Sequence, residues 1–177
     1  MADILIEGRL EARNAHCLVK NRLTELPEEF QSKFNVVCFT ECPRSEIKNF
    51  ARPMKGRSYQ VAPFGVAFKK SFLARAIPVF YAPFPADKAA WTIFETLVKA
   101  EDWHTLVDFF PFVSQMRSEF DWHWEREWRT AKNVDFEPGD VEAVFCPRSA
   151  HADLEWALQA ENKEEWYDVT WLDVEDL

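Results

Sequence analysis

The pattern of hydrophobic and polar positions predicts a mixture of strands and helices along the whole chain. Strands are predicted where β-branched and aromatic residues run together between turn-forming residues. These segments are residues 36–40, 64–68, 77–82, 141–146 and 167–172. Helices are predicted where apolar residues recur every three or four positions. They are residues 3–7 (closed by Gly8), 27–34, 43–50, two within 85–111, and 149–160 (opened by Ser149 as its cap). This order predicts an α+β fold, a mostly antiparallel sheet with flanking helices, in one domain spanning residues 1–177.

Residues 120–130, FDWHWEREWRT, carry the clearest alternation. As a strand, which turns successive side chains to opposite faces, the segment would direct its aromatic face to the core. That face would hold Phe120, Trp122, Trp124, Arg126 and Trp128, and the other would hold Glu125, Glu127 and Arg129. A helix is the alternative, because Phe120, Trp124 and Trp128 are spaced by four. The aromatic content and the longer alternation favour the strand.

Two carboxylates on one strand face are candidates for catalysis. The Cβ atoms of Glu125 and Glu127 would lie about 6–7 Å apart, and like charges raise the pKa of at least one carboxyl unless a cation such as Arg129 compensates. Paired carboxylates of this kind serve as general acids and bases and stabilise oxocarbenium-like transition states. Two other interpretations remain open. The face is simply solvated, or the pair holds Arg129 and a second arginine, Arg44 or Arg57, in a buried network.

The end of the strand at residues 36–40 is a second candidate region. Phe39, Thr40 and Glu41 stand where a strand gives way to a helix that Pro43 can open. Side chains and backbone N–H groups often meet a ligand at such junctions, although Thr40 or Glu41 could equally cap the helix. These three residues, with the two arginines of the 120–130 segment, are the candidate substrate- or cofactor-binding residues.

Composition limits the classes of function. With 47% hydrophobic and 15% aromatic residues the chain can bury a large core, and a net charge of −9 argues against a broad grip on nucleic acid. The start lacks a signal peptide and no apolar run approaches about 18 residues, so we expect a cytoplasmic protein that does not contact a membrane. Cys38 and Cys42 with His16 and Cys17 make a weak zinc pattern, and we expect reduced cysteines and no metal.

Four motifs occur in an order that resembles the AbiGi-like family of abortive phage-resistance proteins. They are residues 36–43 (VVCFTECP), 64–70 (FGVAFKK), 78–81 (PVFY) and 125–129 (EREWR), and the similarity covers roughly residues 4–147. Members of that family usually begin with a strand ahead of the helix that residues 4–8 match, so we expect this first strand to be absent here. The resemblance implies a role in phage defence.

A looser similarity links the same order of strands to ADP-ribosyltransferase folds, including the DarT-like enzymes that modify DNA. It implies NAD as the donor, Glu127 as the catalytic carboxylate, Glu125 as the residue that orients the acceptor, and Thr40 in the nicotinamide pocket. Nucleic acid as acceptor is disfavoured by the net charge. The family's antitoxin label implies the alternative, a non-catalytic antitoxin or regulatory subunit that binds a cognate toxin.

Overall fold

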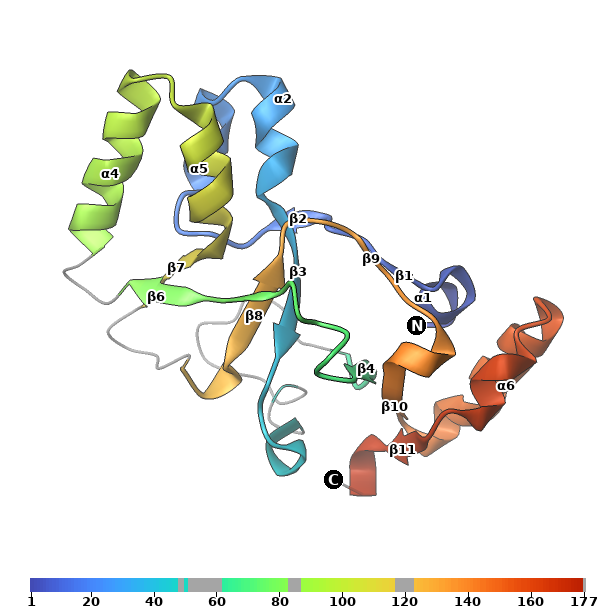
Figure 1. Ribbon diagram of the computed structural model, residues 1–177. Helices are drawn as coiled ribbons and strands as arrows, with labels where there is room; N and C mark the ends of the chain where they lie inside the picture. Colours follow the sequence, from blue (N-terminus) through green and yellow to red (C-terminus); the bar gives the residue numbers. More distant parts are fainter. Residues whose placement is uncertain (48–49, 51–61, 83–86, 117–122, 177) are drawn as a thin grey trace. The chain divides into compact units, whose positions relative to one another are not determined.

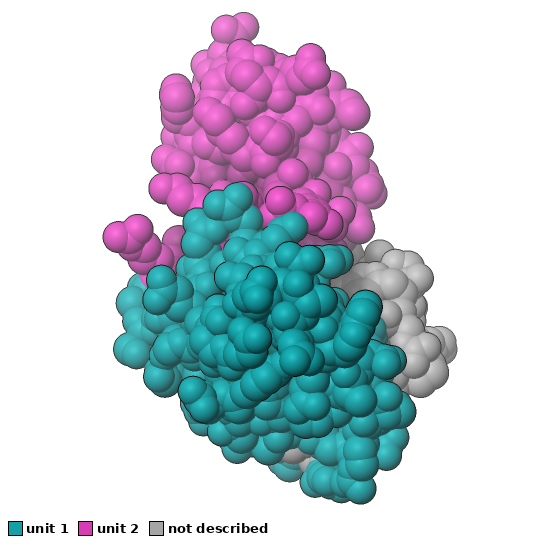
Figure 2. All heavy atoms as spheres, turned by 90° about the vertical axis from the view of Figure 1, so that its right-hand side faces the viewer, with its two compact units in different colours: residues 1–10, 42–74, 135–177 teal, residues 11–41, 75–134 magenta. Residues whose placement is uncertain are grey.

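The computed structural model describes residues 1–47, 50, 62–82, 87–116 and 123–176 of the chain (Figure 1). Its elements mix helices with several small, mainly antiparallel sheets, as an α+β fold requires. The chain divides into two compact units, coloured separately in Figure 2. Unit 1 comprises residues 1–10, 42–74 and 135–177, and unit 2 comprises residues 11–41 and 75–134. β1 (Arg9–Leu10) pairs with β9 (Val134–Asp135).

Unit 1 is built around β10, whose VEAVFC sequence is apolar at all positions but one. β10 runs antiparallel to β4 and parallel to β11. The elements of this unit are α1 (Ala2–Glu7), η3 (Arg44–Glu46), β4 (Gly65–Phe68), η6 (Pro138–Asp140), β10 (Val141–Cys146), α6 (Arg148–Ala160), η7 (Glu164–Asp168), β11 (Trp171–Asp173) and η8 (Val174–Asp176). Its buried core consists of Leu5, Phe136, Val141, Val144, Leu158 and Trp166. Burial of these side chains from α1, β10, α6 and η7 therefore joins the helices to the sheet.

Gly8 is required where α1 ends. Its φ of 60° lies in the left-handed region that favours glycine at helix ends. A Cβ at this position would come within 2.6 Å of the Phe136 carbonyl oxygen. The same two residues are joined by a hydrogen bond of 2.7 Å from the Phe136 amide to the Gly8 carbonyl. Any side chain here would push the two backbones apart.

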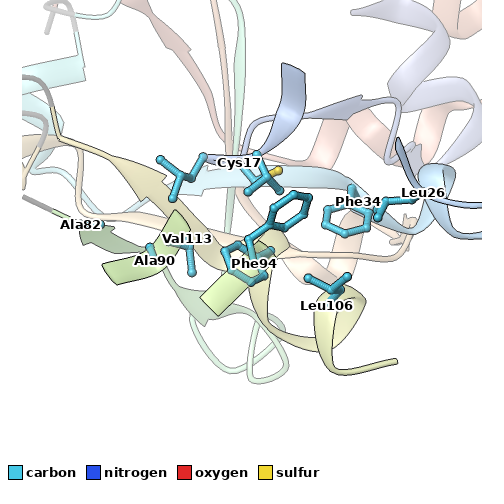
Figure 3. Close-up of a cluster of buried hydrophobic side chains, with 11 residues drawn as sticks. Cys17, Leu26, Phe34, Ala82, Ala90, Phe94, Leu106 and Val113 are labelled. Atoms are coloured by element: carbon cyan, nitrogen blue, oxygen red, sulfur yellow. The ribbon is translucent and has the colours of Figure 1, made fainter. Parts of the chain in front are cut away.

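Unit 2 combines an antiparallel sheet, in the order β2-β3-β8-β5, with helices. β6 and β7 form a separate parallel pair. The strands are β2 (Asn14–Ala15), β3 (Asn35–Thr40), β5 (Ile77–Pro78), β6 (Phe80–Ala82), β7 (Val113–Gln115) and β8 (Glu127–Thr130). The helices are η1 (Lys20–Glu25), α2 (Glu28–Gln31), η2 (Ser32–Phe34), α4 (Asp87–Lys99), α5 (Trp103–Phe109), η4 (Phe110–Phe112) and η5 (His123–Glu125). Figure 3 shows the core of this unit, in which Phe34, Phe94 and Leu106 come together with Cys17 and Val113.

Most of the predicted elements are confirmed. The helices at both ends, the two aromatic-striped helices in the middle and the strands at 36–40, 64–68 and 141–146 all form. Three predictions are wrong in detail. The 77–82 strand divides into β5 and β6, which join different sheets. Ser149 does not cap α6, whose N-cap is Pro147. The last strand begins at Trp171, because residues 164–168 form η7.

Within the described residues, no helix combines the length and apolarity needed to cross a membrane.

Candidate functional site

The predicted strand at 120–130 forms only over its last four residues. Residues 117–122, and with them Phe120 and Trp122, lie outside the described part of the chain. His123–Glu125 form the 3₁₀ turn η5, and β8 begins at Glu127. Between them Arg126 has a φ of 43°, in the left-handed region that a branched or long side chain seldom adopts. This residue breaks the alternation, so Glu125 and Glu127 do not stand on one strand face.

The assignment of the two faces of β8 is also wrong. Arg129 is only 2% exposed, whereas Trp128 on the opposite face is half-buried. The charged face therefore points into unit 2. Burial of a charged side chain costs desolvation free energy, so buried charges are normally paired and hydrogen-bonded.

The pairing comes from Glu127, which shares that face because side chains two residues apart on a strand point the same way. Glu127 Oε1 accepts a hydrogen bond of 2.8 Å from Arg129 Nε, and Oε2 accepts one of 3.0 Å from Nη2. This is the bidentate fork that arginine and carboxylate geometries favour. The exposed fractions of the two side chains are 3% for Arg129 and 13% for Glu127. Of the predicted buried network, the geometry shows the pairing of Glu127 with Arg129. Arg44 pairs with Glu142 instead, and Arg57 lies outside the described residues.

Two of the remaining N–H groups of the guanidinium donate to the segment before β7 and to β7 itself. Nη1 donates to the Pro111 carbonyl oxygen at 2.9 Å, and Nη2 donates to Ser114 Oγ at 2.7 Å. Ser114 Oγ in turn donates to the His16 carbonyl oxygen at 3.1 Å. Burial opposes the charge of Arg129, but the carboxylate of Glu127 outweighs it and raises the pKa of the guanidinium. The arginine is held charged, with four of its five N–H groups donating hydrogen bonds.

Tyr81 on β6 completes the environment of the carboxylate. Its hydroxyl donates to Glu127 Oε2 at 3.0 Å. Burial raises the pKa of Tyr81, and the carboxylates of Glu127 and Glu125 raise it further. The tyrosine is therefore a fixed donor, not a proton acceptor. We call Tyr81, Ser114, Glu127 and Arg129 the β8 network.

The end of β3 lies alongside this network. In the antiparallel register Thr40 is opposite Glu127, and Cys38 is opposite Arg129. Opposite residues of such a pair share a face. Cys38 is an exposed residue. Desolvation of its sulfur by the surrounding polypeptide and then the Glu127 carboxylate nevertheless raise the pKa of its thiol to about 12. The thiol is therefore protonated at neutral pH, and a protonated thiol is a poor nucleophile.

All seven residues predicted for the site lie at this junction. Thr40 Oγ1 donates to the Glu125 carbonyl oxygen, and the Glu41 amide donates to the Arg126 carbonyl at 3.2 Å. On the opposite face of the strand pair, Phe39 is opposite Trp128, whose Nε1 donates to Glu41 Oε2 at 3.0 Å. The predicted residues are gathered, but they are divided between two faces. Glu127, Arg129 and Thr40 share one face, whereas Phe39 and Glu41 belong to the other.

Sequence reasoning missed Tyr81 and Ser114. Both occupy middle positions of three-residue strands, Tyr81 in β6 and Ser114 in β7, and they are directly paired with each other. Tyr81 was available as a signal in the PVFY motif, where a phenol stands in an otherwise apolar strand. Ser114 offers no such signal, because a single serine in a sequence is typical of any surface segment.

The site offers few open polar atoms to a cofactor. A carboxylate has about four lone-pair positions, and three of those of Glu127 accept bonds from Arg129 and Tyr81. The Thr40 hydroxyl hydrogen is committed to the Glu125 carbonyl. In this arrangement Glu127 and Thr40 are thus engaged mainly within the protein. In the part of the chain that the structure describes, no group of three or more His, Cys, Asp or Glu side chains is arranged to hold a metal ion.

Comparisons of the chain with protein-family models, with curated proteins and with solved structures gave no match.

Proposed function

We propose that this protein is a non-catalytic antitoxin or regulatory subunit of a phage-defence system of the abortive-infection type, and that it binds a cognate toxin. The observation that carries the proposal is the state of Glu127. Both oxygens of this carboxylate are occupied by Arg129 and Tyr81 inside unit 2, which is the geometry of a structural ion pair. The resemblance of the four motifs to the AbiGi-like family supports the defence role, and the net charge of −9 favours a basic partner.

Co-expression tests the proposal. The product of the neighbouring gene is produced in a bacterial host alone, with this chain, and with the Glu125→Gln variant. We expect the neighbouring product to slow growth, and both forms of the chain to restore growth and to co-elute with it from a sizing column. Glu125 is the better choice for this variant, because it lies outside the buried fork and its substitution leaves the fork intact. Separate elution together with unrestored growth would contradict the proposal.

An ADP-ribosyltransferase-like site with NAD as donor is the second candidate. It is favoured by the register of β3 and β8, which sets Thr40 opposite Glu127 next to a cation. Purified protein incubated with labelled NAD and nucleic-acid or protein acceptors decides between the two. Our first proposal requires that no label is transferred. Transfer by the wild type that is lost in a folded Glu127→Gln protein would favour the enzyme.

A further inference from the structure

The outer side of α6 carries the most exposed large hydrophobic side chain in the described part of the chain. Leu154 and Leu158 of this helix are buried in unit 1. Trp156 lies two residues from each, which at about 100° per residue places it on the opposite side of the helix. Its exposed fraction is 72%. Folding of unit 1 therefore does not use this indole.

The neighbours of Trp156 leave the indole accessible. Ala152 and Ala160 stand one helical turn before and after it, and both are small and exposed. A second aromatic residue, Tyr167, follows on η7, with an exposed fraction of 43%. Its hydroxyl donates to the Glu155 carbonyl oxygen at 3.2 Å, which holds η7 beside the middle of α6. We call this region the α6 outer surface, consisting of Ala152, Asp153, Glu155, Trp156, Gln159, Ala160 and Tyr167.

The charge around these aromatic residues is mainly negative. Between residues 149 and 170 the sequence holds six acidic residues and one basic residue, Lys163. The acidic residues, all of them exposed, are Asp153, Glu155, Glu161, Glu164, Glu165 and Asp168. Lys163 Nζ is 3.7 Å from Glu165 Oε1, so its charge is shared with that carboxylate. Desolvation raises the pKa of the Tyr167 hydroxyl, and the carboxylates of Glu164 and Glu155 raise it further. Trp156 and Tyr167 are thus surrounded mainly by negatively charged side chains.

We infer that the α6 outer surface is the docking site for a basic protein, which receives the Trp156 indole in an apolar pocket and places Lys and Arg side chains against the surrounding carboxylates. This inference rests on the proposed function and names where the cognate toxin binds. Tryptophan is among the residues that contribute most to protein interfaces, and such anchors are typically ringed by weaker polar contacts. Complementary charge accelerates association and selects the partner. A second copy of the chain would bring like charges together, which disfavours self-association through this surface.

The test measures binding of the full chain to the purified product of the neighbouring gene, as equilibrium affinity and association rate. We expect Trp156→Ala to weaken binding about tenfold or more. The matched control is Ile93→Ala, which removes an apolar side chain of 48% exposure from α4, also a helix of 13 residues. This control should change affinity by less than about twofold. The Glu155→Lys/Glu164→Lys double variant should slow association about tenfold at low salt and less at high salt.

The outcomes separate this inference from the proposed function. If the wild type binds the neighbouring product and both Trp156→Ala and the charge-reversal variant bind equally well, the inference is wrong and the antitoxin proposal stands. If the wild type does not bind, the proposed function fails and this inference fails with it. Sedimentation that shows a wild-type dimer lost in Trp156→Ala would overturn the inference in favour of a second copy. If circular dichroism shows that Trp156→Ala folds poorly, affinity and association rate are measured with Trp156→Phe and the charge-reversal variant instead.

Discussion

Each unit of the molecule contains a glutamate–arginine ion pair whose glutamate lies on a sheet, and the two pairs have similar distances but differ in burial and in the number of hydrogen bonds. In unit 2 Glu127 on β8 pairs with Arg129 at 2.8 Å, with exposed side-chain fractions of 13% and 3%. In unit 1 Glu142 on β10 pairs with Arg44 at 2.7 Å, with exposed fractions of 56% and 55%. Equal distances do not make the pairs equivalent. Water screens the exposed pair and would solvate either partner alone. In the buried pair, a charge left without its partner would remain desolvated and uncompensated.

Removal of one partner from each pair gives the largest expected effect. Glu127→Gln keeps the size of the side chain but leaves the Arg129 charge buried without its counter-charge, and we expect unit 2 to lose about 3–5 kcal/mol of unfolding free energy. Glu142→Gln, the matched control, should cost at most about 1 kcal/mol. Urea unfolding followed by circular dichroism and tryptophan fluorescence measures both. Similar losses for the two variants would mean that burial does not distinguish the pairs.

Burial of apolar side chains stabilises the core of unit 1, and loss of one of them should give the next largest effect. Leu158 is fully buried in the core cluster with Val144 and Trp166, so Leu158→Ala should cost about 3 kcal/mol through lost burial and the cavity left behind. Trp156→Ala on the same helix truncates a larger but exposed side chain and should change the unfolding free energy by less than about 0.5 kcal/mol. Thermal unfolding of the two variants provides the measurement. A large loss from Trp156→Ala would show that its indole packs on the protein.

The same contrast explains which elements could be predicted from the sequence. β10 was recognised because a buried strand is a run of apolar residues, here VEAVFC, in which Glu142 alone is exposed. The residues of β8 were recognised as a strand, but its orientation was not. Alternation shows that two faces differ, and the usual rule places the aromatic face inward. That rule fails at β8 because of partners from segments distant in sequence. Pro111 and Ser114 accept hydrogen bonds from Arg129, and Tyr81 donates one to its counter-charge, Glu127.

The candidate site was predictable as a location, not as an arrangement. The motifs containing Thr40 and Glu127 indicated two strand ends, and the structure pairs them. The break at Arg126 could not be foreseen, since a left-handed arginine is rare and leaves no pattern in the sequence. The break removes Glu125 from the face of Glu127. A mechanism with two carboxylates depended on both standing on the same strand face.

The smallest expected effect comes from a charge that neither pairs with an arginine nor is buried. Asp102 caps α5, with Oδ1 accepting from the Thr105 amide at 3.1 Å and Oδ2 from its hydroxyl at 2.7 Å. These bonds, first that of the Thr105 side chain and then that of its amide, lower the pKa of the carboxyl below 3.8. The folded state therefore binds the proton more weakly than the unfolded state. The contribution is fully present above pH 3.8 and is lost as the pH falls through the lower, folded-state pKa.

Asp102→Asn tests this charge, since asparagine is also a good cap but has no carboxylate. At pH 6 the variant should unfold at a slightly lower temperature than the wild type, and the gap should close as the pH falls through the lowered folded-state pKa of Asp102. Differential scanning calorimetry measures the difference in unfolding temperature between the variant and the wild type at pH 6 and again at a pH below that pKa. Glu142→Gln scanned alongside controls for the general effect of removing one exposed carboxylate. A gap that is unchanged at low pH would mean that the amide and hydroxyl of Thr105 bind Asp102 no better when it is charged. In that case the contrast between screened and buried charges would hold for β8 and β10 but would not extend to helix caps.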